Sequence, residues 1–137
     1  MRSHFHSAVC ATTAFCFYEA LGVLKTKWSK QSRPDSIDQE TYLSACQELC
    51  ALVEDENIQI EVSTLHTREF FDDAERITKA YNIDLSDSFQ LVSLKKGMMA
   101  RLAISTRPVL ITEDKDLRKA AKAEGLEVLG LDDLPST

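Results

Sequence analysis

The sequence predicts an α/β protein with a mainly parallel sheet covered by helices on both faces. Short apolar runs typical of strands alternate with longer segments whose apolar residues recur at helical spacing. Strands separated by helices favour parallel pairing, because each helix carries the chain back across the sheet. A chain of 137 residues with 44% hydrophobic content can form one compact core. We therefore expect a single domain spanning residues 1–137.

The first half of the chain predicts two strands and two helices. Residues 8–15 are small, β-branched or apolar and suit a short strand or a buried lead-in, and residues 15–28 have helical spacing. A polar loop then ends at Ser36 or Asp38, either of which can cap a helix over residues 39–53. Residues 58–62 alternate apolar and polar side chains, which indicates a half-buried strand near an edge of the sheet.

The second half predicts three further helices, a weak helical continuation and two strands. Helical spacing is expected over residues 64–81, over a segment that begins at Asp84 or Ser86, and weakly from Met98 to Ile104. The run of residues 109–111 follows a proline and is typical of a central strand buried on both faces. The last elements are a helix over residues 117–124, a C-cap at Gly125, a strand over residues 127–129 and a tail over residues 131–137.

The net charge and the cysteine content limit the possible functions of the protein. The net charge of −6 disfavours phosphate binding by overall electrostatics, so a nucleic acid would need a local basic patch or a bridging metal ion. The four cysteines form no C-x-x-C pair, and no run is long enough to span a membrane. His4, His6 and Cys10 near the start have no matching second cluster of metal ligands. We expect a soluble, cytoplasmic protein with reduced thiols.

Three carboxylates are candidates for a functional site because of their positions in the predicted elements. Glu19 lies within an apolar helical segment, Asp87 in the first turn of a helix, and Asp114 where the strand of residues 109–111 passes to a helix. Open α/β sheets bind ligands at such carboxyl ends of strands. Each acid also has a structural explanation: Glu19 as a solvated side chain, Asp87 as an acid that favours the helix dipole, and Asp114 as an N-cap.

The segments around these acids resemble PIN domains, the metal-dependent ribonucleases that include bacterial VapC-type toxins. The matching stretches are T-T-A-F-C-F-Y-E-A-L, L-S-D-S-F-Q-L and, most specifically, V-L-I-T-E-D-K-D-L-R-K-A-A-K-A-E-G-L-E-V-L, and together they cover about residues 8–131. The resemblance implies a doubly wound sheet with acids gathered at the carboxyl ends of its strands around Mg²⁺ or Mn²⁺. It implies Glu19, Asp87 and Asp114 as catalytic metal ligands, Asp116 as an accessory ligand, and Thr112 as a supporting residue.

This resemblance implies hydrolysis of single-stranded RNA. Hard oxygen ligands suit Mg²⁺ or Mn²⁺, and such ions relieve the repulsion among clustered carboxylates and assist attack on a phosphodiester. The implied partners are an RNA substrate, an antitoxin protein and a second copy of the chain in a homodimer, with no membrane. Basic residues that could help to bind the RNA are Lys95, Lys96, Arg101, Lys115 and Arg118.

The chain also departs from the PIN pattern. PIN domains normally begin with an apolar strand that ends in Asp and lies in the middle of the sheet, and nothing like it precedes Glu19. We expect either an in-frame extension upstream of Met1 or a short form with weakened metal binding and little activity. The alternative function is a catalytically silent PIN-fold interaction module. A receiver-type phospho-acceptor domain is disfavoured, because no lysine stands at the end of a late strand.

Overall fold

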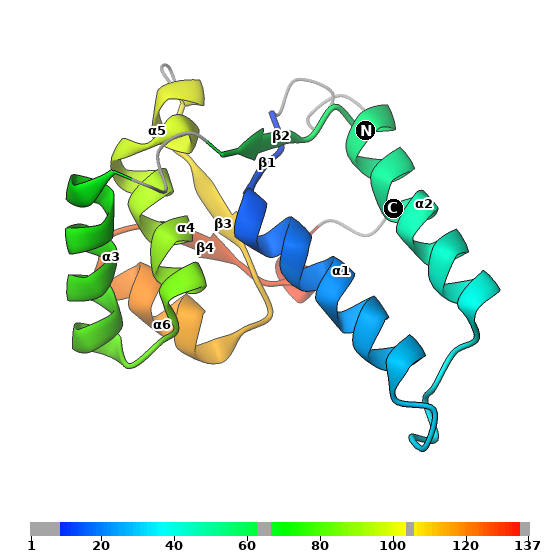
Figure 1. The fold of residues 1–137 in the computed structure, drawn as a ribbon. Coiled ribbons are helices and arrows are strands. Elements are labelled where there is room, and N and C mark those ends of the chain that lie inside the picture. The colour runs from blue at the N-terminus through cyan, green and yellow to red at the C-terminus, as the bar shows by residue number, and fades with distance from the viewer. Residues whose placement is uncertain (1–8, 63–66, 104–105, 135–137) are drawn as a thin grey trace. The chain divides into compact units, whose positions relative to one another are not determined.

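The computed structural model describes residues 9–62, 67–103 and 106–134, and its architecture is mixed α/β (Figure 1). The chain divides into two compact units, Met1–Ile60 and Glu61–Thr137, which are described separately below. Most described residues are helical, and the strands are only three residues long. They pair as two separate two-stranded sheets, β1 with β2 and β3 with β4. A mixed α/β fold is therefore confirmed, whereas one continuous, doubly wound sheet is not seen among the described residues.

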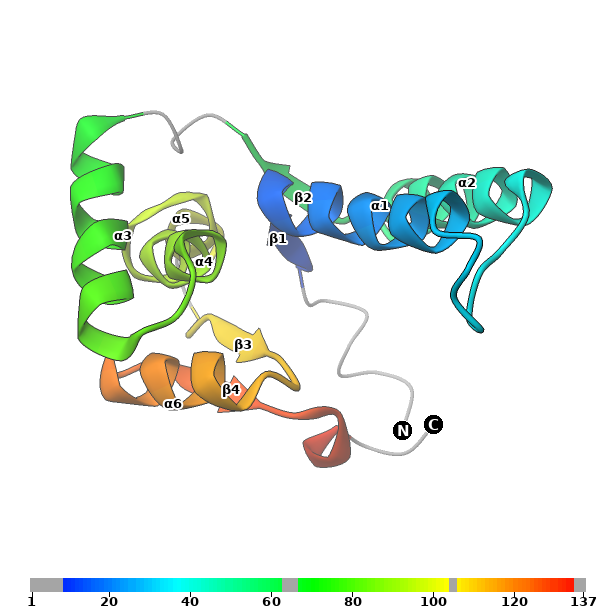
Figure 2. The same ribbon diagram turned by 60° about the horizontal axis from the view of Figure 1, so that its bottom comes forward.

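The first unit contains a pair of helices, with one short strand before it and another after it along the chain. Strand β1 (Ala11–Thr13) leads directly into α1 (Ala14–Ser29), because the side chain of Thr13 caps the helix by accepting the amide of Cys16 at 3.4 Å. Helix α2 (Gln39–Asp55) begins at Asp38, one of the two N-caps that the sequence predicts, and lies beside α1 (Figure 2). Strand β2 (Gln59–Glu61) then pairs with β1.

Few side chains of these two helices are buried. Only Ala14 of α1 and no residue of α2 is buried, although the rings of Trp28 and Tyr42 stack with their centroids 4.9 Å apart. Tyr18 and Val23 are exposed on α1. The helix pair therefore has aromatic contacts but hardly any core within the described residues.

The core of the second unit is formed by helices α3 (Arg68–Tyr81), α4 (Leu85–Lys96) and α6 (Lys115–Ala123), of which α3 packs on both of the others (Figure 1). Its fully buried side chains include Phe89 and Leu91 of α4, Ile77 of α3 and Ala121 of α6. The short helix α5 (Met98–Leu102) follows Gly97. The expected helical residues 64–66 and Ile104 lie outside the described part of the chain.

Strands β3 (Val109–Ile111) and β4 (Glu127–Leu129) form a parallel pair in which Leu110 lies opposite Val128. The prediction that β3 is buried on both faces is wrong: Leu110 is buried, but Val109 and Ile111 are 38% and 50% exposed. The reason is that successive side chains of a strand point to opposite faces, and here only the face of Leu110 is covered.

Both connections around α6 follow the sequence prediction. The helix starts at the N-cap Asp114, and after its end Gly125 adopts φ +79°, a left-handed conformation that glycine adopts without strain. Within the predicted tail, Leu131–Asp133 form one turn of 3-10 helix.

Candidate functional site

The carboxyl end of β3 carries the most specific of the sequence motifs. Asp114 accepts the backbone amides of Asp116 and Leu117 on its Oδ1 atom, both at 2.8 Å, and its own amide donates to the hydroxyl of Thr112 at 3.1 Å. Asp114, Lys115 and Asp116 are exposed. The expected N-cap role of Asp114 is thus present, and it uses one of the two carboxylate oxygens.

Arg118 and Glu113 fasten this turn to the carboxyl end of β4. Arg118 Nη2 donates to the carbonyl of Thr112 at 3.1 Å and lies 3.6 Å from Glu113 Oε1, which also accepts the amide of Leu131. Gly130 permits this approach, since a Cβ atom there would lie 2.0 Å from Arg118 Nη2. Arg118, a predicted RNA contact, therefore has a defined role inside the unit.

Asp87 lies in the first turn of α4 and is half-buried. Its amide donates to the carboxylate of Asp84 at 2.8 Å, so Asp84 is the N-cap of this helix. The Oδ1 atom of Asp87 accepts the side-chain amide of Gln90 at 3.2 Å. The helix start is one of the two that the sequence predicts, and Asp87 is left with a side-chain contact rather than the capping role.

Glu19 is exposed on α1, in the unit Met1–Ile60, whereas Asp87 and Asp114 belong to the unit Glu61–Thr137. Exposed apolar side chains flank it along the chain: Tyr18 is 67% and Val23 57% exposed. The convergence of Glu19 with Asp87 and Asp114 stays a prediction.

No three His, Cys, Asp or Glu side chains lie close enough to hold a metal ion, considering residues 9–62, 67–103 and 106–134. The donor chemistry still fits a hard cation, because the candidate ligands are carboxylates. All four cysteines are free thiols. His4 and His6 lie outside the described residues.

The basic side chains proposed to contact RNA fall into two groups. Lys95 pairs with Glu124, and Lys96 pairs with Asp73 and with Glu69 at 2.9 Å, so both are used within the second unit. Arg101 and Lys115 are exposed and make no ion pair with any other described residue. The second group is better placed to meet a polyanion.

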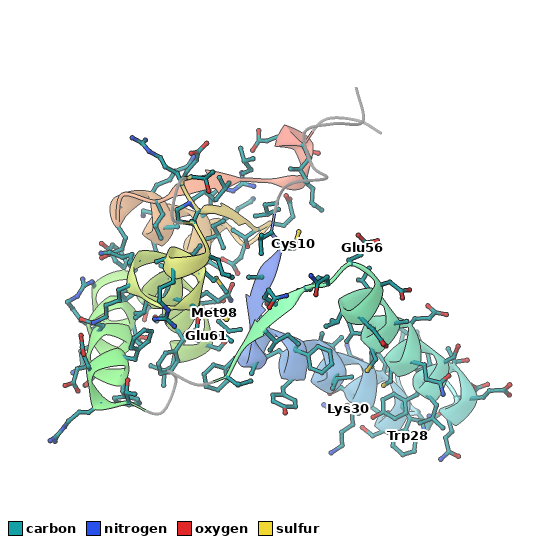
Figure 3. All side chains as sticks on the ribbon, turned by 90° about the horizontal axis from the view of Figure 1, so that it is seen from above. Cys10, Trp28, Lys30, Glu56, Glu61 and Met98 are labelled. Atoms are coloured by element: carbon teal, nitrogen blue, oxygen red, sulfur yellow. The ribbon has the colours of Figure 1, made fainter. Side chains whose placement is uncertain are left out.

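One carboxylate of interest escaped the sequence analysis. Glu61 is completely buried, accepts the hydroxyl of Ser93, and accepts the amide of Met98 at 3.3 Å (Figure 3). The strand is half-buried as expected, but its most buried residue is the acid Glu61, whereas Val62, just beyond the strand, is 64% exposed. The local sequence holds no signal that Ser93 and Met98 would satisfy the oxygens of Glu61.

A hollow at the other end of the sheet is a weaker candidate. It is lined by Arg107, Pro108, Gly125, Leu126 and Glu127, at the amino ends of β3 and β4. Ligands of parallel sheets bind at the carboxyl ends, where Thr112 and Asp114 lie.

No family model matches the chain, and neither a curated protein nor a solved structure matches it. In a search of the part of the chain that the structure describes, no helix is long and apolar enough to cross a membrane.

Proposed function

We propose that this chain is a PIN-like domain that cleaves single-stranded RNA with the help of Mg²⁺ or Mn²⁺. The observation that carries the proposal is the turn from Thr112 to Asp116, which follows the carboxyl end of β3 in its parallel pair with β4. Ligands of open α/β sheets bind at such carboxyl ends.

The position of the acids supports the chemical part of the proposal. Asp114 and Asp116 follow the carboxyl end of β3, which is paired in parallel with β4. The Oδ1 atom of Asp114 is fixed by two amides, and this holds the carboxylate in one orientation.

The residues have separate tasks in this proposal. A bound divalent cation would polarise the scissile phosphate and lower the pKa of the attacking water. The carboxylates of Glu19, Asp87 and Asp114 would hold that cation, with Asp116 as an accessory ligand. Thr112 positions Asp114 through their hydrogen bond.

The test is cleavage of single-stranded RNA by the full chain with Mg²⁺ or Mn²⁺, using Asp114→Asn and a chelator as blanks. We expect slow cleavage that both blanks abolish, because the chain lacks the Asp with which the first strand of PIN domains ends, and the remaining acids hold the ion less firmly. The toxin role would then be tested by growth arrest on expression and by its relief with a neighbouring antitoxin gene.

A second candidate is a catalytically silent PIN-fold interaction module. It is favoured by the fact that Asp114 already caps α6, a role that needs no metal. In this case cleavage is absent with either cation, and the chain acts by binding a partner protein or a second copy of itself.

A further inference from the structure

One face of α6 carries a row of three lysines. Lys115, Lys119 and Lys122 are spaced by four and three residues, which places them on one side of the helix. All three are exposed, and the buried residues Leu117 and Ala121 mark the opposite side. We call these three residues the α6 lysine row.

The charges of the row are not neutralised within the described residues. No ion pair joins Lys115, Lys119 or Lys122 to a described acid, whereas Lys79 pairs with Glu75 and Lys95 with Glu124. The contrast is notable in a chain with 22 acidic and 16 basic residues. An unneutralised row is the local basic patch that an acidic protein would need to bind a polyanion.

Two features of Lys115 cost stability, whereas Lys122 lies in the last turn of α6, where the helix dipole favours a cation. Like charges four residues apart, such as Lys115 and Lys119, destabilise a helix by a few tenths of a kcal/mol. Lys115 additionally lies in the first turn, where the helix dipole favours negative charge. A phosphate chain lying along the row would reverse both effects.

The shape of the row suits an extended strand. Seven residues of α-helix rise by about 10 Å, so the three ammonium groups can contact more than one phosphate of a single strand. No large apolar side chain of α6 is exposed, and this disfavours insertion into a membrane surface. The row begins at the residue after Asp114.

We propose that the α6 lysine row binds the phosphate backbone of single-stranded RNA and guides it to the turn that contains Asp114. The assignment of the ligand as RNA rests on the proposed function. It extends the predicted RNA contact from Lys115 to Lys119 and Lys122 and removes the need for Lys95 and Lys96, which are paired within the protein.

The experiment measures binding of a fluorescently labelled single-stranded RNA of mixed sequence to the full chain in a chelator, at several salt concentrations. The variant Lys115→Gln/Lys119→Gln/Lys122→Gln is compared with a matched control, Lys25→Gln/Lys30→Gln/Lys79→Gln, which changes the net charge equally. Losing three phosphate contacts should reduce the salt slope of log K by about 2 and weaken binding about tenfold or more at low salt. The control should bind as the wild type does.

The proposed role of the lysine row would be contradicted if the wild type did not bind RNA, or if the row variant bound RNA as tightly as the wild type. It would also be contradicted if the control variant were weakened as much as the row variant, or if the wild type bound vesicles containing phosphatidylserine more tightly than RNA. Circular dichroism verifies that each variant is folded. Because binding is measured without metal, it is independent of cleavage. If RNA binding depended on the lysine row but no RNA were cleaved, only the proposed nuclease activity would be refuted. If RNA were cleaved but its binding did not depend on the lysine row, only the proposed role of the row would be refuted.

Discussion

The guanidinium of Arg76 donates two hydrogen bonds to the carboxylate of Glu124, at 3.0 and 3.1 Å, and thereby joins α3 to the end of α6. Tyr81 donates to the same carboxylate at 2.8 Å, and Lys95 of α4 pairs with it. The side chain of Glu124 is only 6% exposed. Hydrogen bonds from Arg76, followed by those from Lys95 and Tyr81, lower the pKa of Glu124 from 4.5 to about 2. One carboxylate therefore links the three main helices of the second unit.

This lowered pKa predicts a dependence of stability on pH. Because the folded-state pKa lies below the unfolded value, the contribution is complete above about pH 4.5 and is lost as the pH falls toward 2. The upper limit of this contribution to stability is about 3 kcal/mol, and solvent screening at the half-exposed Arg76 reduces it.

Glu124→Gln should lower the free energy of unfolding at pH 7 and flatten the fall of that free energy between pH 4.5 and 2. Urea denaturation at several pH values checks this, with the exposed Glu127→Gln as control; an equal slope in wild type and Glu124→Gln would contradict it.

The capping and metal-binding roles of Asp114 can be separated by two substitutions. Asparagine caps a helix about as well as aspartate, so Asp114→Asn should keep the stability of the wild type, whereas Asp114→Ala should lose about 1 kcal/mol. Both should lose RNA cleavage if the carboxylate binds metal. Denaturation and cleavage are measured on the same preparations. Cleavage by Asp114→Asn at the wild-type rate would assign Asp114 to capping alone.

Metal binding predicts a thermal shift. A cation that binds only the folded chain stabilises it by mass action, by about 2.7 kcal/mol at a concentration one hundred times its Kd. Mn²⁺ should therefore raise the melting temperature of the wild type, and Asp87→Asn should abolish the rise without lowering the stability of the metal-free protein. Differential scanning fluorimetry with and without Mn²⁺ measures both effects. A wild-type melt that is indifferent to Mn²⁺ speaks against the three-acid site.

The sequence predicts the elements of this chain better than it predicts their faces. Asp38, Asp114 and Gly125 define helix ends through local hydrogen bonds or φ preferences, and these signals lie within a few residues of where they act. Burial depends on contacts that are distant in sequence. Glu61 is buried because Ser93 and Met98, more than thirty residues away, satisfy its oxygens.

In the candidate site, too, the sequence predicts the local features but not those that depend on distant contacts. The turn from Thr112 to Asp116 is local, and the sequence motif predicts it. The clamp formed by Arg118 and Glu113 with Leu131 depends on the pairing of β3 with β4, which spacing alone does not specify. Whether Glu19 meets the other acids depends on contacts between distant segments, for which a local pattern provides no information.

Two glycines in helical surroundings should respond to alanine in opposite directions. A Cβ atom at Gly97 would lie 2.7 Å from the backbone Cα of Ser93 and 3.1 Å from Glu61 Oε1, so Gly97→Ala must displace the contact that buries Glu61. Overpacking of this kind costs about 1–3 kcal/mol.

A Cβ atom at Gly22, within α1, would have nothing within 4 Å. Gly22→Ala should therefore stabilise the helix by about 0.5–1 kcal/mol, since alanine has the higher helix propensity. Urea denaturation of the two variants beside the wild type measures both changes. A Gly97→Ala protein as stable as the wild type would show that the backbone of Ser93 and the carboxylate of Glu61 are not held against each other at this junction.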